Sequence, residues 1–161
     1  PGNIGATNVL RTGIMRAAAA TLLLDAAKGA VAVLLARLIS GEDAAQLAAL
    51  TAFLGHCFPI WLRFKGGKGV ATFFGILFAL AWPVGLACGA TWAFAVAVTR
   101  QSSMGALMAA SLSVVWTAVL GEGRMIILIF ILTLLIFWRH WPNVQRLRAG
   151  TEPRIGDQGE G

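Results

Sequence analysis

Long apolar segments separated by short charged stretches limit this chain to few folds. A helix needs about 20 consecutive apolar residues to cross the hydrocarbon core of a bilayer. Four segments come close to that length: 13–38, 44–62, 102–120 and 123–141. Only 12% of the residues are charged and 58% are hydrophobic, which is too little charge to cover a soluble domain of 161 residues. The sequence therefore predicts an all-α, polytopic integral membrane protein.

A fifth apolar stretch, 69–99, is too long for one simple span and short for two. Trp82-Pro83 lies near its middle, where proline disfavours continuation of a helix. Two segments, 69–82 and 84–99, would each be about 21–24 Å long at 1.5 Å per residue. Tilting or partial burial can absorb that deficit. This division predicts a helical bundle with about six membrane-spanning segments.

The distribution of basic residues favours six spans over five. With six, most Lys and Arg residues fall on one side, in the loops 1–12, 63–68, 100–101 and 139–161. Cytoplasmic loops of membrane proteins are enriched in these residues, so we place this side in the cytoplasm. The opposite loops hold Arg37 and Arg124. The net charge of +6 then follows from topology, and nucleic acid is not expected as a partner.

The chain begins at Pro1, inside a motif, and not at methionine. We therefore expect residues 1–161 to be a single membrane-embedded domain that lacks its N-terminal first helix. Cys57 and Cys88 both lie in apolar surroundings, with neither a disulfide framework nor metal-ligand spacing. No metal or cofactor is expected.

Three polar stretches meet on the predicted cytoplasmic face: PGNIGATNVLRTG (1–13), GHCFPIWLRFKGGKGVAT (55–72) and RHWPNVQRLRAGTE (139–152). In the second, glycines surround Lys68 just before an apolar helix. Glycine lets successive backbone N–H groups converge on an anion, and a helix N-terminus adds positive potential. Gly69 stands where a Walker loop needs Ser or Thr. Taken alone, the loop is explained equally well as a basic turn on the cytoplasmic side.

In order and spacing, the three stretches together resemble the signature motifs of the bacterial acyl-phosphate:glycerol-3-phosphate acyltransferase family. The resemblance implies seven helices, one of them before Pro1. It implies transfer of a fatty acyl group from acyl-phosphate to the 1-hydroxyl of glycerol 3-phosphate, giving lysophosphatidic acid and phosphate. This is the first acylation of bacterial phospholipid synthesis. The implied location is the bacterial inner membrane with the site facing the cytoplasm, and we expect a monomer.

The resemblance also implies the residues of the site. Catalytic roles fall to Arg11, Lys68, His140 and Asn143. Substrate-binding roles fall to Asn3, Thr7, Asn8, His56, Lys65, Gly66, Gly67, Gly69, Arg100, Ser103, Arg146 and Glu152. Pro1 stands where the family usually has serine, so a hydroxyl contact is lost or replaced there.

Some of these residues have plainer interpretations. His56 and Cys57 suggest a catalytic dyad, but neighbouring helical residues point about 100° apart, and a packed cysteine is expected. Asp25 and Lys28, three residues apart inside the first span, are expected to form a structural ion pair. His140 has an alternative role as an interfacial anchor.

The alternative function is a small membrane transporter of a phosphorylated or anionic solute. Transporters concentrate polar residues near the midplane in broken helices, whereas here nearly all lie at one face. Acyltransferases with a His-x4-Asp motif do not fit, because Ile60 and Val144 stand four residues after the two histidines. Alcohol phosphotransferases need clustered aspartates, and the three in this chain are far apart: Asp25, Asp43 and Asp157.

Overall fold

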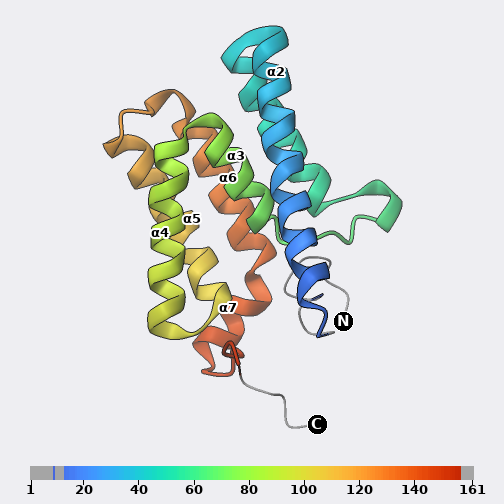
Figure 1. The fold of residues 1–161 in the computed structure, drawn as a ribbon. Coiled ribbons are helices and arrows are strands. Elements are labelled where there is room, and N and C mark those ends of the chain that lie inside the picture. Colours follow the sequence, from blue (N-terminus) through green and yellow to red (C-terminus); the bar gives the residue numbers. More distant parts are fainter. Residues whose placement is uncertain (1–8, 10–12, 157–161) are drawn as a thin grey trace.

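The computed structural model describes residue 9 and residues 13–156, which form helices and contain no strand (Figure 1). The α-helices are α2 (Met15–Cys57), α3 (Val70–Leu80), α4 (Trp82–Thr99), α5 (Ser102–Val119), α6 (Ile126–Arg139) and α7 (Trp141–Arg148). Two 3₁₀ turns are also present, η1 (Ile60–Leu62) and η2 (Gly123–Met125). The prediction of an all-α fold is therefore confirmed for the described residues.

The long element α2 consists of two helices joined at Gly41. The backbone of Gly41 has φ 82° and ψ −166°, a conformation open to glycine and strained for other residues. The chain reverses there, so the second half of α2 runs back beside the first (Figure 1). The predicted break between 38 and 44 is confirmed. The predicted end at 62 is wrong, because Pro59 cannot continue the helix and α2 ends at Cys57.

The break expected at Trp82-Pro83 lies one residue earlier. Ala81 is extended, with φ −152° and ψ 94°, and it separates α3 from α4. Pro83 falls in the first turn of α4, where a missing N–H removes no helical hydrogen bond. The division of 69–99 into two helices is therefore confirmed.

The lengths of the helices support fewer spans than six. Only α4 and α5, among the described residues, are single helices long and apolar enough to cross a membrane. A third span results if Gly123–Arg139 and Trp141–Arg148, bent by 64°, count as one. Helix α3 is apolar but shorter. The predicted number of about six is not confirmed by length and composition.

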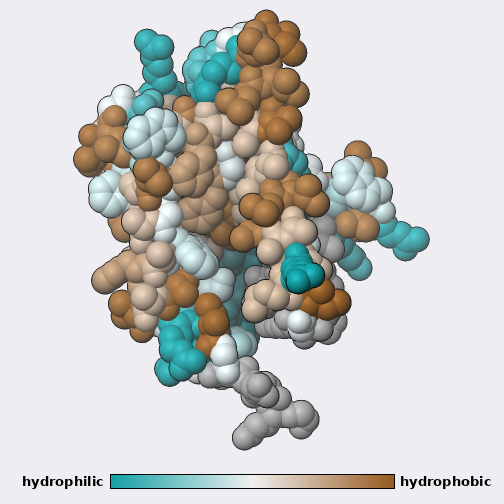
Figure 2. Space-filling view, viewed as in Figure 1, coloured by the Kyte–Doolittle hydropathy of each residue, from teal (hydrophilic) through white to brown (hydrophobic). Residues whose placement is uncertain are grey.

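The core of the bundle forms where α2 and α3 meet the later helices. Its largest fully buried apolar side chains include Phe53, Phe73, Ile76 and Ile129. Many leucine, isoleucine and phenylalanine side chains are exposed instead, and Figure 2 shows hydrophobic residues over much of one face. A soluble protein rarely exposes so much apolar surface, whereas lipid covers it in a membrane.

Small residues let α2 and α3 approach closely. A Cβ at Gly75 would overlap the backbone of Ala26, and one at Gly29 would lie 2.8 Å from the carbonyl oxygen of Thr72. The Thr72 hydroxyl donates a 2.9 Å hydrogen bond to the carbonyl oxygen of Asp25 across the same interface. The first half of α2 is therefore held rigidly against the helix that follows the glycine loop.

Gly75→Ala should destabilise the protein by about 1–3 kcal/mol, because the added methyl group meets backbone that cannot move aside. Gly89→Ala is the matched control, because nothing lies within 4 Å of the position that its Cβ would take, and alanine favours a helix by about 1 kcal/mol over glycine. Thermal unfolding in detergent measures both variants. Equal melting temperatures for the two variants would contradict the close α2–α3 contact.

Candidate active site

The backbone of the glycine loop, residues 66–69, is held by hydrogen bonds to neighbouring helices. The N–H groups of Gly66 and Gly67 donate to the carbonyl oxygens of Cys57 and His56, at 3.1 and 3.2 Å. Arg139 donates from Nε to the carbonyl oxygen of Gly67 at 3.0 Å and from its terminal nitrogen to that of Gly66 at 2.8 Å. The loop is therefore held by the end of α2 on one side and by the end of α6 on the other.

The glycines of the loop have a different role from the anion binding predicted from the sequence. The N–H groups of Gly66 and Gly67 are bonded within the protein, so these two do not form the predicted anion-binding concavity. Glycine is required for close approach instead. A Cβ at Gly66 would overlap the backbone of His56 and Cys57, and one at Gly69 would overlap the ring of Phe53. Gly69 also has φ 81°, which other residues rarely adopt.

Lys68 lies in a hydrogen-bonded network that joins distant segments of the chain. Its ammonium donates to Asn143 Oδ1 at 2.6 Å, and Asn143 Nδ2 donates to Glu152 Oε1 at 2.6 Å. Ser103 Oγ donates to the same oxygen at 2.6 Å. Arg146 Nε donates to Glu152 Oε2 at 2.7 Å. The second and third motifs and the start of α5 therefore converge on one carboxylate.

Glu152 is ionised at neutral pH in this network. Its side chain is only 7% exposed, and this burial by itself would raise the pKa of the carboxyl group. Hydrogen bonds from Ser103, Asn143 and Arg146 to the carboxylate outweigh the burial and lower its pKa below the ordinary value of 4.5. Beside this one anion lie the cations of Lys68 and Arg146, so the cluster keeps a positive excess that suits a phosphate group.

His140 lies between α6 and α7 and is 2% exposed. Its Nδ1 is 2.8 Å from the carbonyl oxygen of Ile136. A carbonyl oxygen only accepts, so Nδ1 carries the hydrogen. Burial lowers the pKa of His140 to about 4, so the ring is neutral at pH 7 and Nε2 is left as an acceptor. A nitrogen that accepts can hydrogen-bond a substrate hydroxyl. The burial of the ring is at odds with a purely interfacial anchor, which would stay exposed.

The expected ion pair of Asp25 and Lys28 is confirmed, and His56 joins it. The Lys28 ammonium lies 2.6 Å from Asp25 Oδ1 and 2.5 Å from His56 Nδ1. An ammonium only donates, so His56 Nδ1 accepts. The cluster lies next to the glycine loop, because the N–H of Gly67 donates a hydrogen bond to the carbonyl oxygen of His56. Cys57 is fully buried and packed, as expected.

The other predicted site residues lie apart from this network or outside the described residues. Arg100 donates to the carbonyl oxygen of Ile155 at 2.8 Å and ties the C-terminal segment to the end of α4. Lys65 is exposed in the turn before the glycine loop. Four residues of the first motif lie outside the described residues: Asn3, Thr7, Asn8 and Arg11.

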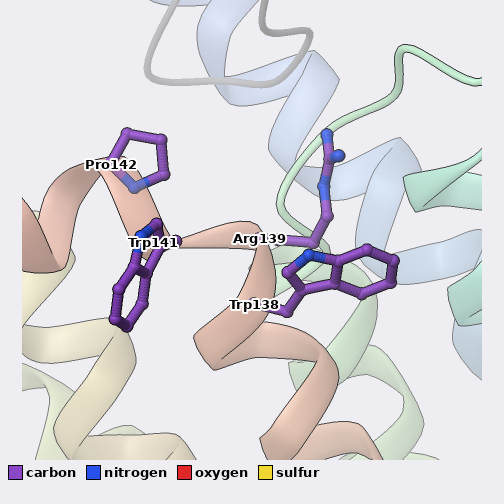
Figure 3. A pocket seen from close by; sticks show the side chains of 4 residues that line it. All are labelled: Trp138, Arg139, Trp141 and Pro142. Carbon is purple, nitrogen blue, oxygen red and sulfur yellow. The ribbon is translucent and has the colours of Figure 1, made fainter.

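Arg139 is a site residue that the sequence analysis missed. Besides its bonds to the glycine loop, its guanidinium lies 5.3 Å from the centroid of the Phe58 ring. Figure 3 shows Arg139 pointing toward the chain that leads into α3, beside a cavity of about 360 Å³ that Trp138, Trp141 and Pro142 also line. Its place at the end of an apolar helix, next to His140, was the available signal.

The sequence of the chain matches a known protein family. A family model described as glycerol-3-phosphate acyltransferase matches residues 1–150. The chain belongs to this family. It is 65% identical to the glycerol-3-phosphate acyltransferase of Cereibacter sphaeroides (strain ATCC 17025 / ATH 2.4.3), over 96% of this chain and 74% of that protein. It is 64% identical to that of Ruegeria pomeroyi (strain ATCC 700808 / DSM 15171 / DSS-3), over 98% and 77%.

Two solved structures have the same fold. They are crystal structures of PlsY (YgiH), an integral membrane glycerol 3-phosphate acyltransferase, in its glycerol 3-phosphate form and its lysophosphatidic acid form. Each gives a TM-score of 0.91 at 33% identity and covers 96% of this chain, with 79% and 81% of the respective solved chain covered. The chain is therefore an integral membrane acyltransferase, and the transporter alternative has no support.

The network around Glu152 should weaken in acid. Its folded pKa lies below 4.5, so its stabilisation is complete above 4.5 and is lost as the pH falls through the lower folded value. Melting temperatures of the wild type should therefore fall in that acidic range. Glu152→Gln, which cannot ionise, should be less stable at pH 7 and should lack this part of the pH dependence. Identical pH profiles for the two proteins would contradict an ionised Glu152.

Proposed function

We propose that this protein transfers a fatty acyl group from acyl-phosphate to the 1-hydroxyl of glycerol 3-phosphate, giving lysophosphatidic acid and phosphate. The observation that carries the proposal is the network in which Asn143 and Arg146 donate to Glu152 and Asn143 also accepts from Lys68. It presents cationic and amide groups at one end of an apolar bundle. Both substrates carry phosphate, which the cationic groups can bind. One substrate also carries a long acyl chain, which the apolar helices can contact.

The residues of the network have distinct proposed roles. Lys68 and Arg146 bind substrate phosphate through charge-assisted hydrogen bonds. Asn143 is oriented by Glu152 and holds the Lys68 ammonium in place. The free acceptor of His140, together with Asn143, orients the glycerol hydroxyl. Ser103 supports this arrangement through its bond to Glu152.

The reaction needs little chemical activation from the protein. The hydroxyl oxygen of glycerol 3-phosphate attacks the acyl carbonyl carbon, the bond from that carbon to the phosphate oxygen breaks, and the hydroxyl proton ends on the released phosphate. Acyl-phosphate is a mixed anhydride with a good leaving group. Holding the two substrates in line and stabilising the developing negative charge can therefore supply most of the rate enhancement.

The first motif is proposed to complete the site. Its residues Asn3, Thr7, Asn8 and Arg11 are predicted contacts of acyl-phosphate, with Arg11 gripping the phosphate through paired N–H donors. Arg100 stays a predicted substrate-binding residue, and its bond to Ile155 gives it a structural task as well.

We also propose the topology of a monomeric bacterial inner-membrane enzyme whose site faces the cytoplasm. The six proposed spans are the two halves of α2, then α3, α4, α5 and α6. The support is the distribution of charge. The basic residues of the glycine loop and of α7 lie at one end, while Arg37 lies at the reversal of α2 and pairs with Glu42 at 2.8 Å.

An assay of the full-length protein with two donors tests the function. Reconstituted in bilayers, it should form lysophosphatidic acid from glycerol 3-phosphate and palmitoyl-phosphate, and should form none from palmitoyl-coenzyme A. A metal chelator should leave the rate unchanged, since charge comes from Lys and Arg side chains. Product from the coenzyme A ester alone, or a chelated enzyme rescued only by a divalent ion, would overturn the proposal.

A further inference from the structure

The segment between α2 and the glycine loop forms a compact turn that projects from the bundle. We call residues 59–65 the aromatic turn. Pro59 accepts at its carbonyl oxygen from the N–H groups of Leu62 and Phe64, at 3.1 and 3.0 Å, and Lys65 donates to the carbonyl oxygen of Leu62 at 3.0 Å. Figure 1 shows the turn reaching sideways, away from the other helices, beside α2. These hydrogen bonds within the segment give it a defined turn conformation.

The aromatic turn exposes large apolar side chains beside two cations. The exposed fractions are 75% for Ile60, 80% for Trp61 and 60% for Phe64. Arg63 and Lys65 are exposed as well. In water this arrangement would leave three large apolar side chains of one short turn uncovered, which is unfavourable. At a membrane interface the same mixture is favourable, because aromatic rings collect there and Arg and Lys reach the headgroups.

The length of the second half of α2 places the turn at that interface. The helix runs from Glu42, which pairs with Arg37 at the reversal, to Cys57. These 15 steps span about 22 Å at 1.5 Å per residue. The hydrocarbon core is about 30 Å thick, so a helix that begins near one headgroup layer ends about 8 Å short of the other, within reach of the turn that follows. The aromatic turn then continues into the headgroup region on the side of the glycine loop.

The backbone of the turn is strained. Arg63 and Phe64 have φ of 51° and 63°, in the left-handed region that residues with side chains seldom adopt. A plain connection would carry glycine or asparagine at such positions. Two bulky side chains held in a strained conformation mark the turn as a candidate functional segment.

We propose that the aromatic turn docks onto the anionic lipid surface of the leaflet next to the site. Ile60, Trp61 and Phe64 insert at the boundary of headgroups and acyl chains. Arg63 and Lys65 bind headgroup phosphates, which makes Lys65 a lipid contact in place of the substrate contact predicted from sequence. The turn leads directly into Gly66, so its docking restrains the loop that carries Lys68.

A quenching experiment tests this docking without relying on activity. Trp61→Cys in the otherwise unchanged full chain is labelled with a fluorophore and placed in nanodiscs of phosphatidylcholine, with or without phosphatidylglycerol. Cys57 and Cys88 are fully buried, so labelling is selective. Lipids with a nitroxide near the headgroup should quench the label strongly, and acrylamide, a neutral aqueous quencher, weakly. Phe94→Cys, an exposed position within α4, is the control for a label deep in lipid.

Anionic lipid should lower the acrylamide accessibility of the label by about fivefold for each basic side chain that engages it. Adding Arg63→Gln should remove one such factor, whereas adding Arg124→Gln, at an exposed arginine within η2, should not. Free access by acrylamide in both lipids would overturn the proposal. Protection from both lipid and aqueous quenchers would indicate a protein partner and would overturn it as well.

Discussion

The carboxylate of Glu152 accepts hydrogen bonds from Ser103, Asn143 and Arg146, and the polar end of the bundle depends on it. Without this anion, the ammonium of Lys68 and the guanidinium of Arg146 would repel each other beside apolar helices. With it, Asn143 is turned so that its oxygen faces Lys68. One negative charge thus fixes the cations and leaves them in excess, which is the condition for holding a substrate phosphate.

The glycine loop owes its position to contacts on several sides. The ends of α2 and α6 bind its backbone, through His56, Cys57 and Arg139. The opposite charges of Asp25 and Lys28 cancel in their ion pair, so this pair stabilises the end of α2 and would not attract an anion strongly. The loop thereby presents Lys68 as a fixed cation. A rigid site fits a reaction in which positioning supplies most of the rate.

Many of the helix boundaries could be predicted from the sequence, because proline, glycine and the length of an apolar segment act locally. The break near Trp82-Pro83 and the break between residues 38 and 44 followed from such signals. The end of α2 did not, because the residues after Pro59 are apolar but lie in a turn. The role of Gly66 could not be predicted either. Glycine serves both anion binding and close packing, and only the position of the His56 and Cys57 carbonyls distinguishes them.

Steady-state kinetics of Lys68→Ala, with Arg148→Gln as control, test the central claim most directly. Both changes remove one positive charge from the same end, but Arg148 is exposed on α7 and takes no part in the network. If Lys68 binds substrate phosphate, its loss should cost roughly 2–4 kcal/mol, or about 30- to 1,000-fold in kcat/KM, with folding retained. Arg148→Gln should stay near wild type. Near wild-type kinetics for Lys68→Ala would contradict the account.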